Sequence, residues 1–441
     1  MAPQYQRVLF TGPTGVKKKH VLAMVVREYF KENFPHLLVP ENDEELLDDP
    51  NVKRYIQFLS LEEEIKRSKN LEIPTWLERE EERLEEDWKE AFSEVLKKLR
   101  KLPENIIAFI ELHTHYFRGQ KRLFLIELRE ILKLKPNLII TLINDVYSIY
   151  YEVKKRELSK PTGSYLRLSD ILDWRDREIS FSDSLARTLK IKNYVVSVKH
   201  PTKMLYRLIF ERDKRCSCYL SFPITETRKT KEGIEEINEH RYRLHQTKHI
   251  VFDPLTIDER AIQFAFQSKF GNEAIEDPSK ISEKSIKLER IHRWPIQDQE
   301  YSPMVPDPPD LFPLDLPSYE VYSVVYRPLE EEKEVGKKKF WRCQIDSQIE
   351  ERDKHIIRRM DYFIAYRPYW KGKESKGVLS ELAYATGKVP CIVYHPEEDE
   401  ALLKMRGVSP FEKTEGLIVF SDKEKFYKYI ENLRCVKKPN S

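Results

Sequence analysis

The amino-acid sequence predicts an α/β protein of two domains, each built on a parallel sheet. The chain has 441 residues, more than one hydrophobic core usually serves, and 40% of them are hydrophobic. Short apolar runs typical of buried strands alternate with amphipathic helical stretches, and this alternation occurs twice along the chain. The break between Tyr194 and Cys216 places the expected domains at residues 1–213 and 214–441.

The first alternation begins near the amino terminus. Arg7 to Phe10 is predicted to be a buried strand, and a helical pattern from Lys18 to Asn33 follows a short glycine-containing loop. Residues 41–104 are rich in acidic and basic side chains and are expected to be helical, most clearly from Trp76 to Lys101. Two further strands are expected at 106–112 and 138–142.

The second alternation predicts the second sheet. Its expected strands are 216–222, 249–252, 319–326, 362–366, 389–394 and 417–420. Its expected helices are 232–246, 347–360, 378–386 and 423–433. Residues 269–317 interrupt the pattern as an insertion, and the proline-rich stretch from Ser302 to Pro317 is expected to be an irregular loop.

Composition and charge argue against several classes of function. Charged residues make up 34% of the chain but the net charge is only +3, whereas non-specific nucleic-acid binding usually needs a strong basic excess. No apolar run reaches the roughly 18 residues that span a bilayer, and the first residues do not resemble a signal peptide. We therefore expect a cytoplasmic protein that binds neither membrane nor nucleic acid. Its 12 glycines and many charges fit a heat-adapted protein.

The cysteines indicate a chain of free thiols. The sequence has five, with no CxxC pair, so we expect neither a zinc site nor a disulfide scaffold. Cys216 and Cys218 are two residues apart in a predicted strand and should face the same side of it as buried thiols.

A glycine-containing loop joins the first strand to the first helix, which is the context that a phosphate-binding loop requires. Gly12-Pro-Thr-Gly15-Val16-Lys17-Lys18-Lys19 resembles a Walker A motif of the form GPTGVGKT, with Gly12 and Lys18 in place. Lys17 replaces the last glycine and Lys19 replaces the serine or threonine. The missing hydroxyl would normally bind Mg²⁺, so the loop could neutralise phosphate with lysines and amides without a metal.

Residues 5–210 resemble archaeal adenylate kinases and related small nucleotide kinases. The similarity continues in Phe109–His115, where His113 stands in place of an aspartate, and in Asn137–Asp145. Asp173–Glu178 resembles their lid segment, so the resemblance implies that Arg175 and Arg177 clamp phosphates. Three interpretations stay open: an active kinase with another Mg²⁺ ligand, a phosphate-binding or nucleotide-binding domain without efficient transfer, and an inherited scaffold. A need for ATP or Mg²⁺ is therefore left open.

Three motifs in order along the second domain resemble the nucleoside 2-deoxyribosyltransferase and nucleotide N-hydrolase superfamily. Cys218–Ile224 is similar to its first strand, of the type YLAGP, and Ile349–Asp361 to a helix with an Arg-Asp pair. Gly377–Pro390 is similar to its active-site helix, GTxxELGYAxxxGKP. The resemblance implies that a Rossmann-like sheet follows the kinase-like sheet along the chain. It also implies an oligomer that completes its sites across subunits.

The resemblance also implies the residues that act. Glu381 would be the carboxylate nucleophile at the oxocarbenium-like sugar carbon, with no cofactor needed. Asp353 would hold sugar hydroxyls, and the phenol of Tyr219 would fix the carboxylate. Each of these roles has a structural alternative. Glu381 could be an exposed helix residue, Asp353 could form a surface salt bridge, and Tyr219 could pack in the core. In the family that the second domain resembles, an acidic residue shortly before the glycine often helps to handle the base. Here Ser375-Lys376 stands directly before Gly377, so the acid that would protonate the leaving group is unassigned.

Further residues would line the substrate. Ser380 and the amides near Gly377 would receive a 5′-phosphate. Phe222 and Pro223 would border the pocket, and Tyr366 would stack on a base or belong to a hydrophobic lid. The expected substrate is a nucleoside, a nucleotide or NAD, and the expected reaction is N-glycosidic cleavage or base exchange. The alternatives are a non-catalytic nucleotide sensor and a nucleoside monophosphate kinase in the first domain.

Overall fold

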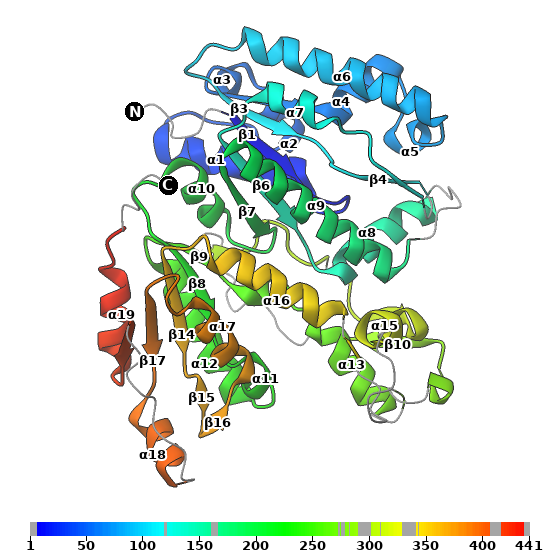
Figure 1. Cartoon of the computed structure of the whole chain (residues 1–441). Coiled ribbons are helices and arrows are strands. Elements are labelled where there is room, and N and C mark those ends of the chain that lie inside the picture. Colours follow the sequence, from blue (N-terminus) through cyan, green and yellow to red (C-terminus); the bar gives the residue numbers. More distant parts are fainter. Residues whose placement is uncertain are drawn as a thin grey trace. The chain divides into compact units, whose positions relative to one another are not determined.

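The computed structural model describes residues 7–118, 121–159, 166–271, 274, 278–281, 283–289, 301–308, 310–328, 341–342, 344–405 and 416–435. These residues form an α/β structure with two five-stranded parallel sheets (Figure 1), which confirms the predicted class. The chain divides into two compact units. The first takes Met1–Lys199, Ile257–Arg290 and Met304–Gln348, and the second takes His200–Thr256, Ile291–Pro303 and Ile349–Ser441.

This division differs from a single break after residue 213. The chain leaves the first unit at Lys199, returns to it at Ile257, and helix α16 (Gln344–Ile357) passes from the first unit to the second. Much of the expected insertion therefore belongs to the first unit. Its helix α13 (Arg260–Phe270) packs Phe266 against Tyr322 and Tyr326, which are 56 and 60 residues further along the chain, so no local pattern pairs these rings.

The first sheet has the strand order β2-β3-β1-β6-β7. Its strands are β1 (Arg7–Thr11), β2 (Ile56–Ser60), β3 (Ile107–Glu111), β6 (Leu138–Ile143) and β7 (Lys192–Ser197). The helices of this unit are α1 (Lys18–Asn33), α2 (Asp43–Asp48), α3 (Pro50–Lys53), α4 (Leu61–Lys69), α5 (Ile73–Trp76), α6 (Glu81–Lys101), α7 (Leu128–Leu134), α8 (Val146–Ser159), α9 (Leu168–Leu189), α13 and α15 (Ser318–Val325). Short antiparallel pairs join β4 (Tyr116–Arg118) to β5 (Lys121–Leu123), β10 (Ser285–Leu288) to β11 (Leu314–Pro317), and β12 (Arg327–Pro328) to β13 (Trp341–Arg342).

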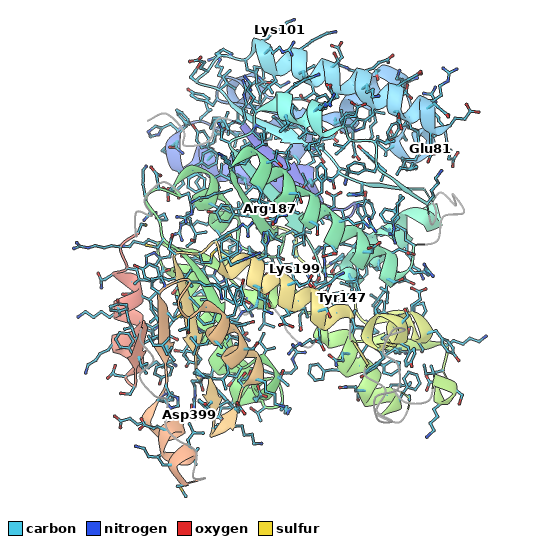
Figure 2. All side chains as sticks on the ribbon, in the orientation of Figure 1. Glu81, Lys101, Tyr147, Arg187, Lys199 and Asp399 are labelled. Carbon is cyan, nitrogen blue, oxygen red and sulfur yellow. The ribbon has the colours of Figure 1, made fainter. Side chains whose placement is uncertain are left out.

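One face of the first sheet carries an apolar cluster that includes α6. Leu9 and Ile110 of the sheet pack with Trp88 and Phe92 of α6, whose ring centroids stack 4.9 Å apart. Helix α6, whose ends Glu81 and Lys101 are labelled in Figure 2, buries an apolar stripe, as its periodicity predicts. Most of its charged side chains lie outside this stripe, but Asp87 is buried and accepts a hydrogen bond from Trp76 Nε1 at 3.0 Å.

Four expectations for this unit are wrong. Residues 41–104 contain strand β2 as well as helices, the helix predicted from Trp76 begins only at Glu81, and residues 318–325 form a helix instead of a strand. The proline-rich loop ends in β11, which pairs with β10. The sequence pattern did not predict strand β2, because Gln57 and charged neighbours interrupt its apolar run. Its extended conformation depends on pairing with β3.

The second sheet has the strand order β18-β17-β14-β8-β9. Its strands are β8 (Ser217–Ser221), β9 (Ile250–Phe252), β14 (Tyr362–Tyr366), β17 (Cys391–Tyr394) and β18 (Leu417–Phe420). The helices of this unit are α10 (Thr202–Phe210), α11 (Ile224–Thr227), α12 (Lys231–Gln246), α17 (Lys376–Ala385), α18 (Glu397–Met405) and α19 (Lys423–Glu431), and β15 (Tyr369–Trp370) pairs with β16 (Lys373–Glu374). The first connection leads from β8 to one neighbour, β9, and the next strand, β14, lies on the other side, so the strand order reverses between β8 and β14.

Alternation along β8 sends its side chains to opposite faces of the sheet. Cys218 and Leu220 pack with Ile237 of α12 and Phe426 of α19, and Cys216 lies in the same cluster, so Cys216 and Cys218 share a side as predicted. The intervening Tyr219 points to the other face, where its ring stacks 5.9 Å from that of Phe363. That second face carries the candidate site.

No helix among the described residues is long and apolar enough to cross a membrane.

Candidate functional site

Glu381 lies at the edge of the buried face of α17. The helix turns Val378, Leu382 and Ala385 toward the sheet at helical spacing, and Glu381 stands next to this stripe, where it is half-buried. Glu381 is the sixth residue of the helix, past the turn in which free amides hold an anion. Side chains of the sheet must therefore orient its carboxylate.

Two hydroxyls of β8 bind the two oxygens of that carboxylate. The Tyr219 phenol donates to Oε1 at 3.3 Å, and the Ser221 hydroxyl donates to Oε2 at 2.5 Å. The contact between Tyr219 and Glu381 is the one that the sequence predicted. Ser221 was missed, although its spacing of two residues from Tyr219 places both side chains on the same face of a strand.

Asp353 of α16 lies close enough to Tyr219 for its charge to act on the phenol. Asp353 is buried and accepts a hydrogen bond from Arg352 Nε at 3.0 Å. Burial, and then the negative charges of Asp353 and Glu381, raise the pKa of Tyr219 well above its usual value. The phenol therefore stays protonated and serves as a hydrogen-bond donor between two carboxyl groups.

These groups lie at the point where the strand order reverses. Ser221 ends β8, the parallel neighbour β14 ends at Tyr366, and α17 follows β14. Ligands of open parallel sheets bind beyond the carboxyl ends of the strands at such a reversal. Asp361, the last residue of the predicted helix motif, lies at the opposite ends of the strands, where it accepts hydrogen bonds from Ser217 N and Arg212, so its role is structural.

The predicted substrate-binding residues separate into two groups. Gly377 and Ser380 are exposed on α17, the helix that carries Glu381, and Pro223 is the residue before α11, two positions after β8 ends. Phe222 and Tyr366 instead belong to the apolar cluster on the other face of the sheet, packed against α12 and α19. The structure does not bring those two aromatic rings to Glu381.

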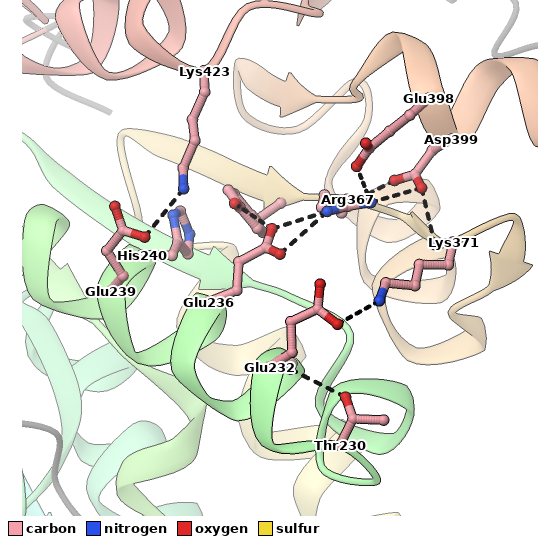
Figure 3. A network of polar contacts seen from close by, with 12 residues as sticks. Thr230, Glu232, Glu236, Glu239, His240, Arg367, Lys371, Glu398, Asp399 and Lys423 are labelled. Carbon is pink, nitrogen blue, oxygen red and sulfur yellow. Dashed lines mark hydrogen bonds and ion pairs between the residues drawn. The ribbon is translucent and has the colours of Figure 1, made fainter.

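Tyr366 belongs to a polar network on its own face of the sheet. Its hydroxyl donates to Glu236 at 2.7 Å, and its ring stacks 4.0 Å from His240. The next residue, the buried Arg367, binds Asp399 of α18 through two hydrogen bonds of 2.7 and 2.8 Å and also contacts Glu236 (Figure 3). This network fixes the chain where it leaves β14 and turns toward α17.

In the first unit, the loop after β1 makes a tight turn. Gly12, Gly15 and Lys17 have positive φ angles of 142°, 91° and 53°. A Cβ atom on Gly12 would lie 2.3 Å from the carbonyl oxygen of Leu142, so only glycine fits there. Lys17 adopts the left-handed conformation at a cost of about 1 kcal/mol relative to glycine. The loop thereby brings backbone amides to the amino end of α1.

The lysines of this loop each contact another side chain of the same unit. The ammonium of Lys17 pairs with Glu152 at 3.0 Å, that of Lys19 with Glu44 at 3.2 Å, and that of the buried Lys18 with His113 Nε2 at 2.7 Å. An incoming phosphate would have to compete with these partners. Lys18 also donates to the Gly12 carbonyl at 3.2 Å, which folds its side chain back over the loop.

The two expected clamp arginines lie in the middle of the continuous helix α9, so the predicted lid is a helix in this structure. Arg175 is 3% exposed and pairs with the fully buried Glu259, with Nη2 donating to Oε2 at 2.8 Å. It also donates to the Asn144 carbonyl at 3.1 Å. Arg177 is exposed and pairs with Asp173 on the same helix at 3.3 Å. Arg175 is buried and its two Nη atoms already bind Glu259 and the Asn144 carbonyl, so an incoming phosphate would have to displace these partners.

Acidic groups near this loop are also engaged. Asp145 pairs with Lys199, which bonds Asp307 at 2.7 Å, and burial raises the pKa of Asp145 to about 6. Glu178 accepts the amides of Thr114 and His115 at 3.1 and 3.2 Å. Among the described residues, no group of histidine, cysteine and acidic side chains has the arrangement of a metal site.

A surface depression of about 310 Å³ lies apart from these groups. Arg243, Thr247 and Glu431 line it at the carboxyl-terminal end of α12. Since α12 leads to the start of β9, the depression lies at the opposite edge of the sheet from Glu381. Arg243 of its lining is bound to Glu424 at 2.7 and 2.9 Å, and the depression contributes nothing to the candidate site.

A search of protein-family models finds none that matches this chain, and a search of curated proteins finds no match either.

Proposed function

We propose that the second unit cleaves, or exchanges the base of, the N-glycosidic bond of a nucleoside, a nucleotide or NAD, with Glu381 as the nucleophile. One observation carries the proposal: each carboxylate oxygen of Glu381 binds a hydroxyl of β8 at the carboxyl ends of the strands. A surface glutamate engaged only with a lysine would not be held in this way, and two bonds leave the carboxylate little freedom to rotate.

The arrangement suits displacement at a sugar carbon. One oxygen of Glu381 attacks the anomeric carbon as the carbon–nitrogen bond breaks and its electron pair leaves with the base, which gives a glycosyl ester. Water or a second base then attacks the same carbon and releases the carboxylate. The bond that Glu381 keeps with the second hydroxyl holds it in place during both steps.

Asp353 and Tyr219 complete the site in this proposal. Arg352 compensates the charge of Asp353, so this carboxylate can stand close to that of Glu381 and accept hydrogen bonds from sugar hydroxyls. Tyr219 keeps its proton and separates the two acids. Gly377 and Ser380 on the exposed side of α17 stand where a 5′-phosphate would meet the helix.

The first unit supports a separate proposal, that it binds phosphate or a nucleotide without efficient phosphoryl transfer. The support is the retained turn at Gly12, Gly15 and Lys17, together with a lysine at position 19 that cannot bind Mg²⁺. The carboxylate partners of Lys17 and Lys19 favour weak binding. In this proposal Arg175 has no part.

The test is to incubate the purified full chain with a panel of nucleosides, 5′-monophosphates and NAD, and to follow free base by chromatography. We expect base release that Glu381→Gln lowers by about 10³-fold or more while the melting temperature stays unchanged. Glu235→Gln is the matched control, because Glu235 is exposed on α12 at the other face of the sheet. Near-normal turnover in Glu381→Gln would refute the assignment. Binding of a nucleotide without any turnover would favour a sensor.

A further inference from the structure

Two thiols from distant parts of the chain meet at the amino-terminal ends of the strands of the second sheet, whereas Glu381 lies at their carboxyl-terminal ends. Cys216 directly precedes β8, and Cys435 follows α19 near the end of the described chain. Their sulfur atoms lie 3.1 Å apart, although 219 residues separate them. A disulfide bond joins sulfurs at about 2.05 Å, so a displacement of about 1 Å would close one.

Rigid elements bring the two thiols together. Asp361 accepts hydrogen bonds from the amide and hydroxyl of Ser217, which fixes the chain beside Cys216 to the start of β14. Helix α19 buries Phe426 and Ile430 in the cluster on which Cys435 also packs. The short distance between the sulfurs therefore follows from the packing of α19 on the sheet.

The two thiols differ in their access to solvent. Cys216 is 1% exposed, and burial, followed by its contact with Cys435, raises the pKa of its thiol, so it is protonated and shielded. Cys435 is partly exposed and follows the last helix. A reagent in solution reaches Cys435 first, and Cys216 is the thiol in position to resolve the product.

We propose that Cys216 and Cys435 are an oxidation site that closes to a disulfide when the protein meets a small disulfide such as oxidised glutathione. The Cys435 thiolate attacks the glutathione disulfide and expels one thiol, forming a mixed disulfide. The Cys216 thiol then loses its proton and attacks the Cys435 sulfur, which expels the second thiol. In sum, two cysteines are oxidised and one small disulfide is reduced to two thiols.

The disulfide bond would link the chain after α19 covalently to the start of β8. A link that closes a loop of this length restricts the unfolded chain strongly, so it should act on stability. Because it forms at the amino ends of the strands, it leaves the groups around Glu381 in place. Intracellular disulfides are rare except in proteins from hyperthermophiles, and the composition of this chain fits a heat-adapted protein.

The test treats the full chain with oxidised glutathione in a Cys343→Ser background, because Cys343 lies outside the described residues. We expect the intact mass to fall by two hydrogen atoms, peptide mapping to join Cys216 to Cys435, and the melting temperature to rise until dithiothreitol is added. Cys435→Ser should abolish all three effects. Cys391→Ser, which removes a buried thiol from the interior strand β17, should leave the link intact.

Three results would overturn the proposal: a mixed disulfide that persists on Cys435, a link from Cys435 to Cys218, or an unchanged mass. None of these readouts depends on base release, so the proposed glycosidase activity can fail while the oxidation site stands.

Discussion

Replacing Arg175 by methionine tests whether this side chain stabilises the first unit or binds phosphate. The substitution keeps most of the aliphatic volume and removes the charge opposite Glu259, which is 0% exposed. It also deprives the Asn144 carbonyl and the Gln348 side chain of a donor at 3.1 and 2.9 Å. Glu259 keeps the amide of Val146 at 2.8 Å as a donor.

The expected loss is about 4 kcal/mol in the free energy of unfolding. Removing one partner of a buried ion pair costs about 3–5 kcal/mol, because the other charge stays buried without compensation. That is a large part of a typical stability of about 5–15 kcal/mol. Adding Glu259→Gln removes the stranded charge, so the double variant should regain about half of the loss.

The chain has two units, so local stability is best measured by hydrogen exchange of peptides from α9, with urea unfolding beside it. Arg177→Met is the matched control two residues away, because its exposed pair with Asp173 should be worth less than about 1 kcal/mol. If Arg175→Met loses less than about 1 kcal/mol of stability and no longer binds ATP, the structural role is refuted. The result would instead support the hypothesis that Arg175 clamps phosphate.

Three further predictions concern the site, the loop and pH. Tyr219→Phe and Ser221→Ala should each slow base release more than they lower the melting temperature. The two losses in rate should not be additive in the double variant, because both hydroxyls bind the same carboxylate. Equal losses in rate and stability would assign both to the core. Calorimetric titration with ATP should show binding by the first unit that persists in a chelator and weakens with salt, without transfer to nucleoside monophosphates. Robust Mg²⁺-dependent transfer would contradict this. Burial, and then the Arg177 charge, lower the pKa of His115 to about 4, below its unfolded value of about 6.5. Its contribution to stability is therefore present above pH 6.5 and is lost as the pH falls toward 4, by up to about 3 kcal/mol, and His115→Gln should flatten this dependence in urea unfolding at several pH values.

The sequence predicted the parts of the fold that depend on local patterns. The strands at Arg7, Leu138 and Tyr362 and the helix from Lys18 lie where they were expected, because each is a dense apolar run or a clear amphipathic stripe. The contact between Tyr219 and Glu381 is the one that the family resemblance of the second domain implied. Ser318–Val325 was misassigned because its mixture of valines and tyrosines favours strands, whereas packing on α13 makes it helical.

The sequence by itself determined the fold class, most of the strands and helices, the tight turn at Gly12 and the side of β8 on which Tyr219 lies, since all of these follow from periodicity and backbone sterics. Only the tertiary structure decided which partner each charge meets. It buried Arg175 against Glu259, turned Tyr366 away from Glu381, and brought Cys216 to Cys435. A polar side chain acts through neighbours that lie far away in the sequence, and only the packing of whole elements brings them within a few ångströms.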